Sequence, residues 1–222
     1  MIMRRKFQFC ALCAWVATVA LAVFCSCSDE MDDLGYKEIS YGYVDLGLPS
    51  GTLWATCNVG ATSPEQAGLY FAWGETVGYT AAQIGPGGRR FTRELYRCPD
   101  YDEDLDLYHD AAHAYMGGSW RMPTETELRE LVENCSCEWT ADYNGTGVSG
   151  YILRSRLGDG FLFFPSTGYA SLCKVVNTES GTEYWTSTKN GICAKSLYFN
   201  SGVFTIHNGN RTFGLCVRGV RK

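Results

Sequence analysis

The stretch that decides the fold is SWRMPTETELRELVENC, residues 119–135. Thr124 followed three residues later by Glu127 predicts a capping box, in which each side chain accepts a hydrogen bond from the other residue's backbone N–H. Pro123, directly before this pair, keeps the chain from entering the cap as a helix. Apolar side chains then recur at helical spacing, at Leu128, Leu131, Val132 and Cys135. We therefore predict one main amphipathic helix that packs across a sheet.

Outside this helix the chain alternates between apolar and polar residues, as β-strands do. We expect strands at 41–46, 52–59, 151–154, 161–165 and 184–188. The last three segments, 194–199, 203–206 and 212–220, predict an antiparallel meander that closes the domain. The aromatic segment 69–74 is interpreted as core, because aromatic side chains supply much of core burial. The pattern as a whole indicates an α+β fold of antiparallel sheets with long loops.

The composition is typical of a single loop-rich domain, with 25 glycines, 14 % aromatic and 19 % charged residues in a chain of 222. The formal net charge is −5, and no acidic residue precedes Cys27. Loss of Arg4, Arg5 and Lys6 with a leader would leave 16 basic against 24 acidic residues. Binding to nucleic acid is excluded as a function, because affinity for phosphate depends on clustered Lys and Arg.

The first 26 residues are interpreted as a lipoprotein signal peptide. Three basic residues precede an uncharged, mainly apolar run at 7–24, and the small residue Ser26 stands before Cys27. Ser26-Cys27 resembles the lipobox of bacterial lipoproteins, which implies that Cys27 is acylated, as with palmitate, and anchors the protein in a membrane. Residues 27–39 would then be the lipidated cysteine and an acidic linker, and 40–222 the folded domain. A membrane-spanning helix at 7–24 is the alternative, because that run is close to the minimum length that crosses a bilayer.

Residues 75–118 predict a long irregular loop, and loops of this length are uncommon unless functional or disordered. Its aromatic residues are the candidate ligand contacts: Tyr79, Phe91, Tyr96, Tyr101 and Tyr108. The loop also carries alternating acids that offer a weak candidate for Ca²⁺, at Asp100, Asp102, Asp104 and Asp106. These acids do not form an EF-hand, since Leu105 replaces the turn glycine and no glutamate closes the loop. A solvated acidic loop is the simpler interpretation.

Cysteines and histidines give no firm metal site. Cys135-Ser136-Cys137 has no second close pair, which zinc would require, and His109 and His113 lack further ligands and are expected in a surface loop. We therefore expect no metal site. Seven cysteines follow Cys27, so disulfides are plausible in an exported domain while one cysteine stays unpaired. Cys193 and Cys216, near the ends of expected strands, would face one another only in the right register.

Several separated motifs resemble, in order, the Fibrobacter succinogenes major paralogous domain family, which is common in Bacteroides-type lipoproteins. They are LPSGTLWATCNVGA at 48–61, YFAWGET at 70–76, DAA at 110–112, GSWRMPT at 118–124, YWTST at 184–188 and VRGVR at 217–221. The resemblance covers about residues 40–222. It implies a C-type-lectin-like fold related to the formylglycine-generating, sulfatase-modifying enzymes. It also implies a disulfide between Cys57 and Cys135.

Known chemistries of related proteins do not carry over with this resemblance. The formylglycine-generating enzymes hold copper with two closely spaced cysteines, whereas Cys193 and Cys216 are far apart in sequence. The sugar-binding tripeptides of C-type lectins are absent as well, and a fold by itself does not assign a function. We expect structural roles for Pro123, Thr124, Glu127 and Trp185, and for Arg121 and Arg218 as buried arginines paired with acids such as Glu125 or Glu75.

The resulting hypothesis is a lipid-anchored outer-membrane protein, exposed at the cell surface. It would serve as a non-enzymatic adhesion or binding module for glycan or protein ligands, because loops on a rigid scaffold usually carry binding. One alternative is a divergent oxidoreductase of the formylglycine-generating type. The other is a purely structural surface component.

Overall fold

The computed structural model describes residues 41–92, 104–178, 181–200 and 203–222. All the described residues belong to one compact unit, which lies within 39–222. The described chain consists mainly of antiparallel strands with few helices, which confirms the α+β class.

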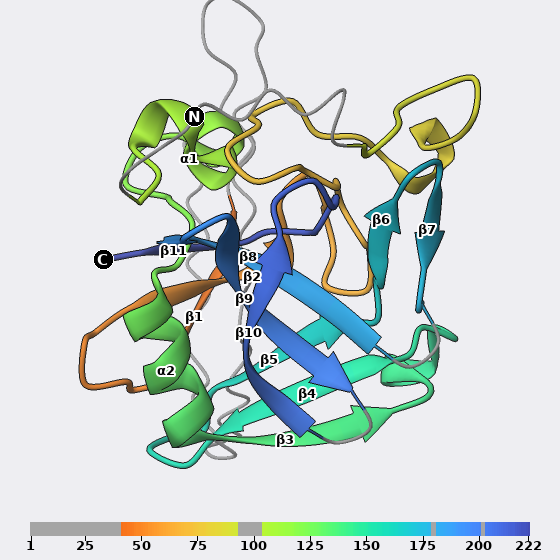
Figure 1. Ribbon diagram of the computed structural model, residues 1–222. Helices are drawn as coiled ribbons and strands as arrows, with labels where there is room; N and C mark the ends of the chain where they lie inside the picture. Colours follow the sequence, from red (N-terminus) through yellow and green to blue (C-terminus); the bar gives the residue numbers. More distant parts are fainter. Residues whose placement is uncertain (1–40, 93–103, 179–180, 201–202) are drawn as a thin grey trace, which may run out of the picture. The chain divides into compact units, whose positions relative to one another are not determined.

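Three three-stranded sheets and one hairpin make up the described β structure (Figure 1). The first sheet has the order β1-β2-β11, with strands Tyr43–Asp45, Leu53–Asn58 and Arg218–Arg221. The second has the order β3-β4-β5, with strands Cys135–Thr140, Gly150–Ser155 and Phe161–Pro165. The third has the order β10-β9-β8, with β8 at Gly181–Asn190, β9 at Cys193–Asn200 and β10 at Val203–Asn210. The hairpin pairs β6, Tyr169–Ser171, with β7, Lys174–Val176.

The main helix, α2, spans Glu125–Asn134 and begins as the sequence predicts. The Thr124 side chain accepts from the backbone of Glu127, and the Glu127 carboxylate accepts from the backbone of Thr124, so the capping box is confirmed. Leu128 and Leu131 are fully buried, and α2 packs against the β8-β9-β10 sheet (Figure 1). Removing a side chain such as Leu131 would cost roughly 2–5 kcal/mol. Cys135 already belongs to β3, a strand that the sequence pattern did not reveal.

The remaining helices are short. They are α1 at Ala111–Met116 and three 3₁₀ turns, η1 at Ala81–Gln83, η2 at Leu107–His109 and η3 at Tyr143–Gly145. Three of the four lie in the region expected to be one irregular loop, so the described part of 75–118 is more ordered than predicted.

Strand β8 separates two hydrophobic clusters. Tyr184 lies in the larger cluster with Leu128 and Leu131, whereas the next residue, Trp185, lies in the smaller one with Phe71 and Trp73. Both faces of β8 are therefore buried, and the strand predicted at 184–188 is confirmed within it. The structural role expected for Trp185 is supported, since its ring is 1 % exposed and its Nε1 donates to the Phe71 carbonyl at 2.8 Å.

The predicted closing meander is wrong in its last strand. The meander consists of β8, β9 and β10, and the chain then leaves it so that β11 pairs with β2 in another sheet. Before β11, Leu215 pairs with Phe71, and within β11 Val220 exchanges two backbone hydrogen bonds with Arg121. The C-terminal segment thus fixes the start of the α2 region against the first sheet. Alternation along a strand shows which face is buried but does not choose the partner strand.

Candidate functional site

The loop 79–91 is built by local hydrogen bonds. The Gln83 side chain accepts from the backbone N–H and hydroxyl of Thr80 at 2.9 and 3.1 Å, which caps η1. The chain then returns on itself, because the Arg89 N–H donates to the Gln83 carbonyl at 2.8 Å and the Gly85 N–H to the Arg89 carbonyl at 3.1 Å. Gly88 permits this approach, since a Cβ there would lie 2.3 Å from the Gln83 carbonyl oxygen. The glycine-rich loop is therefore closed and ordered.

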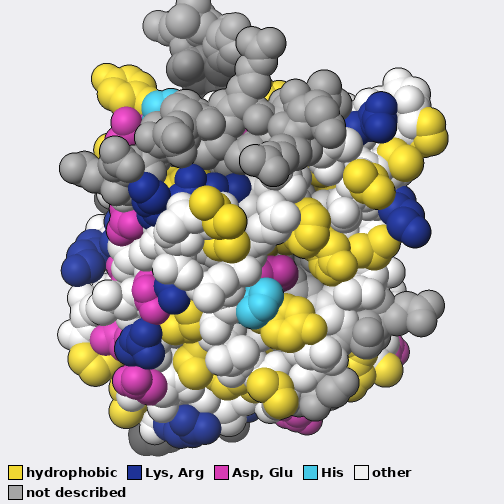
Figure 2. Space-filling view, in the orientation of Figure 1, with side chains coloured by type: hydrophobic (Ala, Val, Ile, Leu, Met, Phe, Trp, Pro, Cys, Tyr) yellow, Lys and Arg dark blue, Asp and Glu magenta, His cyan; other side chains and the backbone are white. Residues whose placement is uncertain are grey.

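Both ends of this loop are tied to the scaffold. Tyr79 exchanges two backbone hydrogen bonds with Tyr70, and Phe91 exchanges two with Leu172 in the turn between β6 and β7. Ile84, halfway along, is buried in the larger hydrophobic cluster. Figure 2 shows hydrophobic and basic side chains together on the corner formed by this loop and the β6–β7 hairpin.

A groove of about 560 Å³ runs over the loop, and we call it the loop groove. It is lined by Tyr79, Ala82, Gln83, Gly85, Gly87, Gly88 and Arg89. The Arg89 guanidinium lies 5.0 Å from the ring centroid of Tyr79 and 4.9 Å from that of Phe91. Its Nη2 donates to both carboxylate oxygens of Glu75, at 2.5 and 2.6 Å. The groove therefore combines an aromatic ring, a side-chain amide and an arginine with backbone exposed at three glycines, and the carboxylate partner of the arginine lies beside it. Such a set of groups can bind a polar ligand.

The five aromatic candidates differ in where they lie and in how exposed they are. Tyr79 lines the loop groove. The prediction for Phe91 is wrong, since this ring is only 2 % exposed and packs edge-on against Tyr79 as part of the core. Tyr108 is 90 % exposed in η2 and is not among the lining residues of the groove. Tyr96 and Tyr101 lie outside the described residues.

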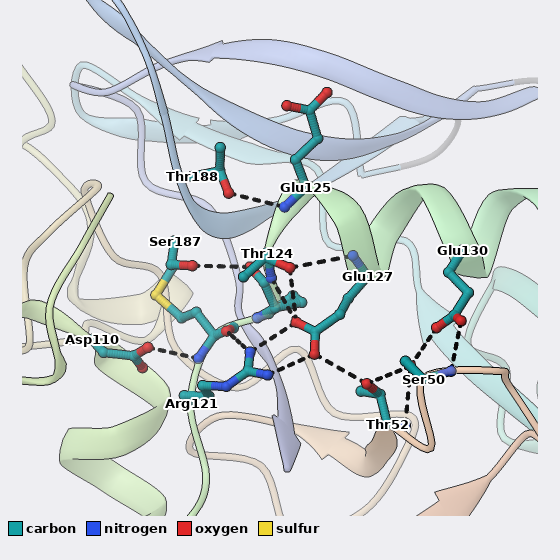
Figure 3. A network of polar contacts seen from close by, with 12 residues as sticks. Ser50, Thr52, Asp110, Arg121, Thr124, Glu125, Glu127, Glu130, Ser187 and Thr188 are labelled. Atoms are coloured by element: carbon teal, nitrogen blue, oxygen red, sulfur yellow. Dashed lines mark hydrogen bonds and ion pairs between the residues drawn. The ribbon is translucent and has the colours of Figure 1, made fainter. Parts of the chain in front are cut away.

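A second polar cluster, the helix-start clamp, consists of Thr52, Arg121, Thr124 and Glu127 (Figure 3). Arg121 donates to both carboxylate oxygens of Glu127, at 2.8 and 2.6 Å, and Thr52 donates to the same carboxylate at 3.0 Å. Arg121 therefore pairs with Glu127, and the predicted partner Glu125 is wrong. Burial alone would raise the pKa of Glu127, but the hydrogen bonds from Arg121 and from the Thr124 backbone outweigh it and lower this pKa to about 2.

Pro123 completes the join between the clamp and the sheet. Its carbonyl accepts from the backbone of Ser187 on β8 at 2.9 Å, and the first N–H of α2, that of Glu125, donates to the Thr188 hydroxyl at 2.9 Å. The clamp's carboxylate is 8 % exposed and is occupied by protein donors. This cluster is structural.

Arg218 is fully buried, as predicted, but it pairs with no acid among the described residues. Its guanidinium donates to the Asn58 side chain and to the carbonyls of Ala55, Thr56 and Phe163, at 2.7 to 3.0 Å. It also lies 4.5 Å from the ring centroid of Phe164. The expected partner Glu75 is instead the partner of Arg89. Arg218 thus joins the first and second sheets through backbone oxygens.

The implied disulfide is not present in the structure, where Cys57, Cys135, Cys193 and Cys216 are all free. Cys57 lies on β2, whereas Cys135 begins β3 in the larger hydrophobic cluster. Cys193 pairs with Asn190 and Asn210 on the neighbouring strands of its sheet. Cys216 forms an isolated β-bridge with Tyr184, and its thiol donates to the Ala67 carbonyl. Burial raises the pKa of Cys135 to about 11 and that of Cys216 to about 12, which favours unreactive thiols.

The acids and histidines of 100–113 are engaged locally where they are described. Asp104 accepts from the Lys189 backbone at 2.8 Å, and Asp106 caps η2 and bonds the His109 ring at 2.7 Å. His113 lies in α1 rather than in a surface loop, and its Nδ1 is 3.2 Å from the Trp120 carbonyl. Asp100 and Asp102 lie outside the described residues. Within the described ranges, no three or more His, Cys, Asp or Glu side chains are grouped to hold a metal ion.

One further histidine contacts a buried acid. Glu183 accepts from the Ser196 hydroxyl at 2.5 Å and from His207 Nδ1 at 3.0 Å. The serine is thus bonded to the carboxylate rather than to the imidazole. It lacks the serine-to-histidine hydrogen bond that activates a nucleophile.

Comparisons of this chain with protein-family models, curated proteins and solved structures found no match. Among the described residues, no helix is long and apolar enough to cross a bilayer, and both the run at 7–24 and Cys27 lie outside them.

Sequence reasoning missed most of the loop groove. It selected Tyr79 and treated 75–118 as one irregular loop, but it assigned no role to Gln83 or Arg89. A Thr80–Gln83 capping box was readable in the sequence, as was the one at Thr124–Glu127. The pairing of Glu75 with Arg89, 14 residues apart, has no such local signature.

Proposed function

We propose that this chain is a lipid-anchored outer-membrane protein that binds glycan or protein ligands at the cell surface without catalysis, through the loop groove. The observation that carries the proposal is the ordered glycine-rich loop 79–91, tied at both ends to a packed core and open along one side. Such loops on a rigid scaffold are where binding residues concentrate. Preorganisation of the loop favours affinity, because little conformational entropy is lost on binding.

We propose a C-type-lectin-like fold on the strength of the family resemblance, within the α+β class that the antiparallel sheets and few helices define. We further propose residues 1–26 as signal peptide, Cys27 as the acylated residue, 27–39 as linker and 40–222 as the binding domain. Incorporation of labelled palmitate into the wild-type protein, and its loss in Cys27→Ala, would test the anchor. Labelling that persists in this variant would contradict it.

Binding is tested with the chain from Ser28 to Lys222, which retains the compact unit 39–222. We expect signal on a glycan array or with a panel of surface proteins, and loss of that signal in Gly87→Leu. A side chain at Gly87 has open space around its Cβ, so it fills the groove without a clash. Gly158→Leu is the matched control, because a Cβ there also meets nothing within 4 Å and Gly158 does not line the groove. Equal binding by both variants would contradict the groove as the site.

The alternative of a formylglycine-generating oxidoreductase predicts copper-dependent oxidation of a cysteine peptide. The raised pKa of Cys216 disfavours the thiolate that a metal ligand requires. Turnover of such a peptide by the copper-treated protein would replace the binding proposal.

A further inference from the structure

The charges at the loop groove cancel. Among its described lining residues, Arg89 is the one that is charged at neutral pH. Glu75 neutralises this charge and accepts two short hydrogen bonds from a single guanidinium nitrogen of Arg89. The side chains of Arg89 and Glu75 are 15 % and 26 % exposed, so the pair sits partly out of water. Arg90 is exposed but does not line the groove.

The polar groups of the groove suit hydroxyls. The side-chain oxygen of Gln83, Oε1, already accepts hydrogen bonds from Thr80, which fixes the orientation of the side-chain amide over the groove. The Arg89 guanidinium supplies donors and the Gln83 side-chain amide supplies a donor and an acceptor, and a hydroxyl can act in both roles at once. Tyr79 adds an aromatic ring, and Gly85 and Gly87 leave a floor without side chains.

An anionic ligand fits this groove poorly. It would lose water around its charge and meet a guanidinium whose own charge is already balanced by Glu75. A neutral polyol loses less hydration free energy and can accept a hydrogen bond from Arg89, which lines the groove.

We infer that the loop groove selects neutral, hydroxyl-rich oligosaccharides over uronate-bearing or sulfated ones, and that the Glu75–Arg89 pair sets this preference. This inference rests on the proposed binding function. It makes Glu75 the residue that determines specificity, although Glu75 itself is not a lining residue.

The test compares neutral oligosaccharides (gluco-, manno- and galacto-configured) with polygalacturonate and sulfated glycans, using the 28–222 chain. We expect neutral ligands to bind with affinity that changes by less than about twofold between 50 and 500 mM NaCl, because screening acts on net charges. Glu75→Gln keeps the side-chain shape but leaves the Arg89 charge unbalanced. This variant should gain salt-sensitive binding of the acidic glycans by about tenfold or more, which corresponds to about 1.4 kcal/mol.

The control is Glu133→Gln, which changes the net charge by the same amount on an exposed position of α2 outside the loop groove. It should leave the preference unchanged, and thermal unfolding of each variant checks that it is folded. Tighter, salt-sensitive binding of acidic glycans by the wild type would overturn this inference and leave the binding function intact. An equal gain in both Gln variants would also overturn it. No glycan binding at all, or binding that survives Gly87→Leu, would overturn the inference together with the glycan form of the proposed function.

Discussion

Two of the Arg–Glu pairs in the described part of the chain, Arg121–Glu127 and Arg89–Glu75, have similar hydrogen-bond lengths and different surroundings. In the helix-start clamp, Glu127 is 8 % exposed and also accepts from Thr52 and Thr124. Beside the loop groove, Glu75 is 26 % exposed, and Arg89 has a buried Nε without a partner among the described residues. The pairing of an arginine with a glutamate therefore does not by itself reveal the role of the pair. A carboxylate enclosed by protein donors holds the fold together, whereas a pair at the edge of a groove can turn toward a ligand.

The largest expected effect is at the clamp. Glu127→Ala should lower the free energy of unfolding by about 3–5 kcal/mol, because it leaves Arg121 without its partner and removes half of the capping box. Urea unfolding followed by tryptophan fluorescence measures this. The exposed Glu133→Ala on the same helix is the control and should stay within about 0.5 kcal/mol of the wild type. Equal effects of Glu127→Ala and Glu133→Ala would show that the clamp contributes no stability of its own, and the contrast between the two Arg–Glu pairs would then be wrong.

The clamp should also dominate stability in acid. The pKa of Glu127 is lowered from its ordinary 4.5 to about 2, so its stabilisation is present above pH 4.5 and is lost as the pH falls toward 2. The loss is on the order of 3 kcal/mol. Urea unfolding at pH 5.5 and pH 2.5 should show that Glu127→Gln lacks this part of the pH dependence. A variant with the full wild-type pH dependence would assign the acid sensitivity to other carboxylates.

A smaller effect is expected from the cap alone. Thr124→Ala removes the hydroxyl that accepts from the Glu127 backbone but leaves the Arg121–Glu127 pair in place. The expected loss is about 1 kcal/mol, measured by the shift in the thermal unfolding midpoint. Thr124→Ser should restore most of it. A loss as large as that of Glu127→Ala would mean that the cap, rather than the ion pair, supports the clamp.

The smallest effect on stability is expected beside the loop groove. Glu75→Gln should change the free energy of unfolding by about 1 kcal/mol or less, because the amide oxygen that replaces the carboxylate can still accept from Arg89 and the pair is partly exposed. Urea unfolding, run together with the binding assay, measures it. A loss of several kcal/mol would show that this pair is a second structural clamp and would weaken the case for a ligand site.

Local features were readable from the sequence because they depend on neighbours a few residues apart. The α2 cap at Thr124 and Glu127, the buried Leu128 and Leu131, and the hairpin of β9 and β10 were all predicted correctly. The exposure of Phe91 was misjudged because its contact with Gly214 and its pairing with Leu172 come from distant parts of the chain.

The class of the fold and the main helix with its first turn could be predicted from the sequence alone, and the family resemblance stays an expectation. Tertiary packing sets which strands pair, which acid each arginine meets and where a groove opens. Arg218 and Asn58 lie 160 residues apart and still share a hydrogen bond. Contacts of this kind depend on how whole sheets pack, and side-chain periodicity within one segment carries no record of that packing.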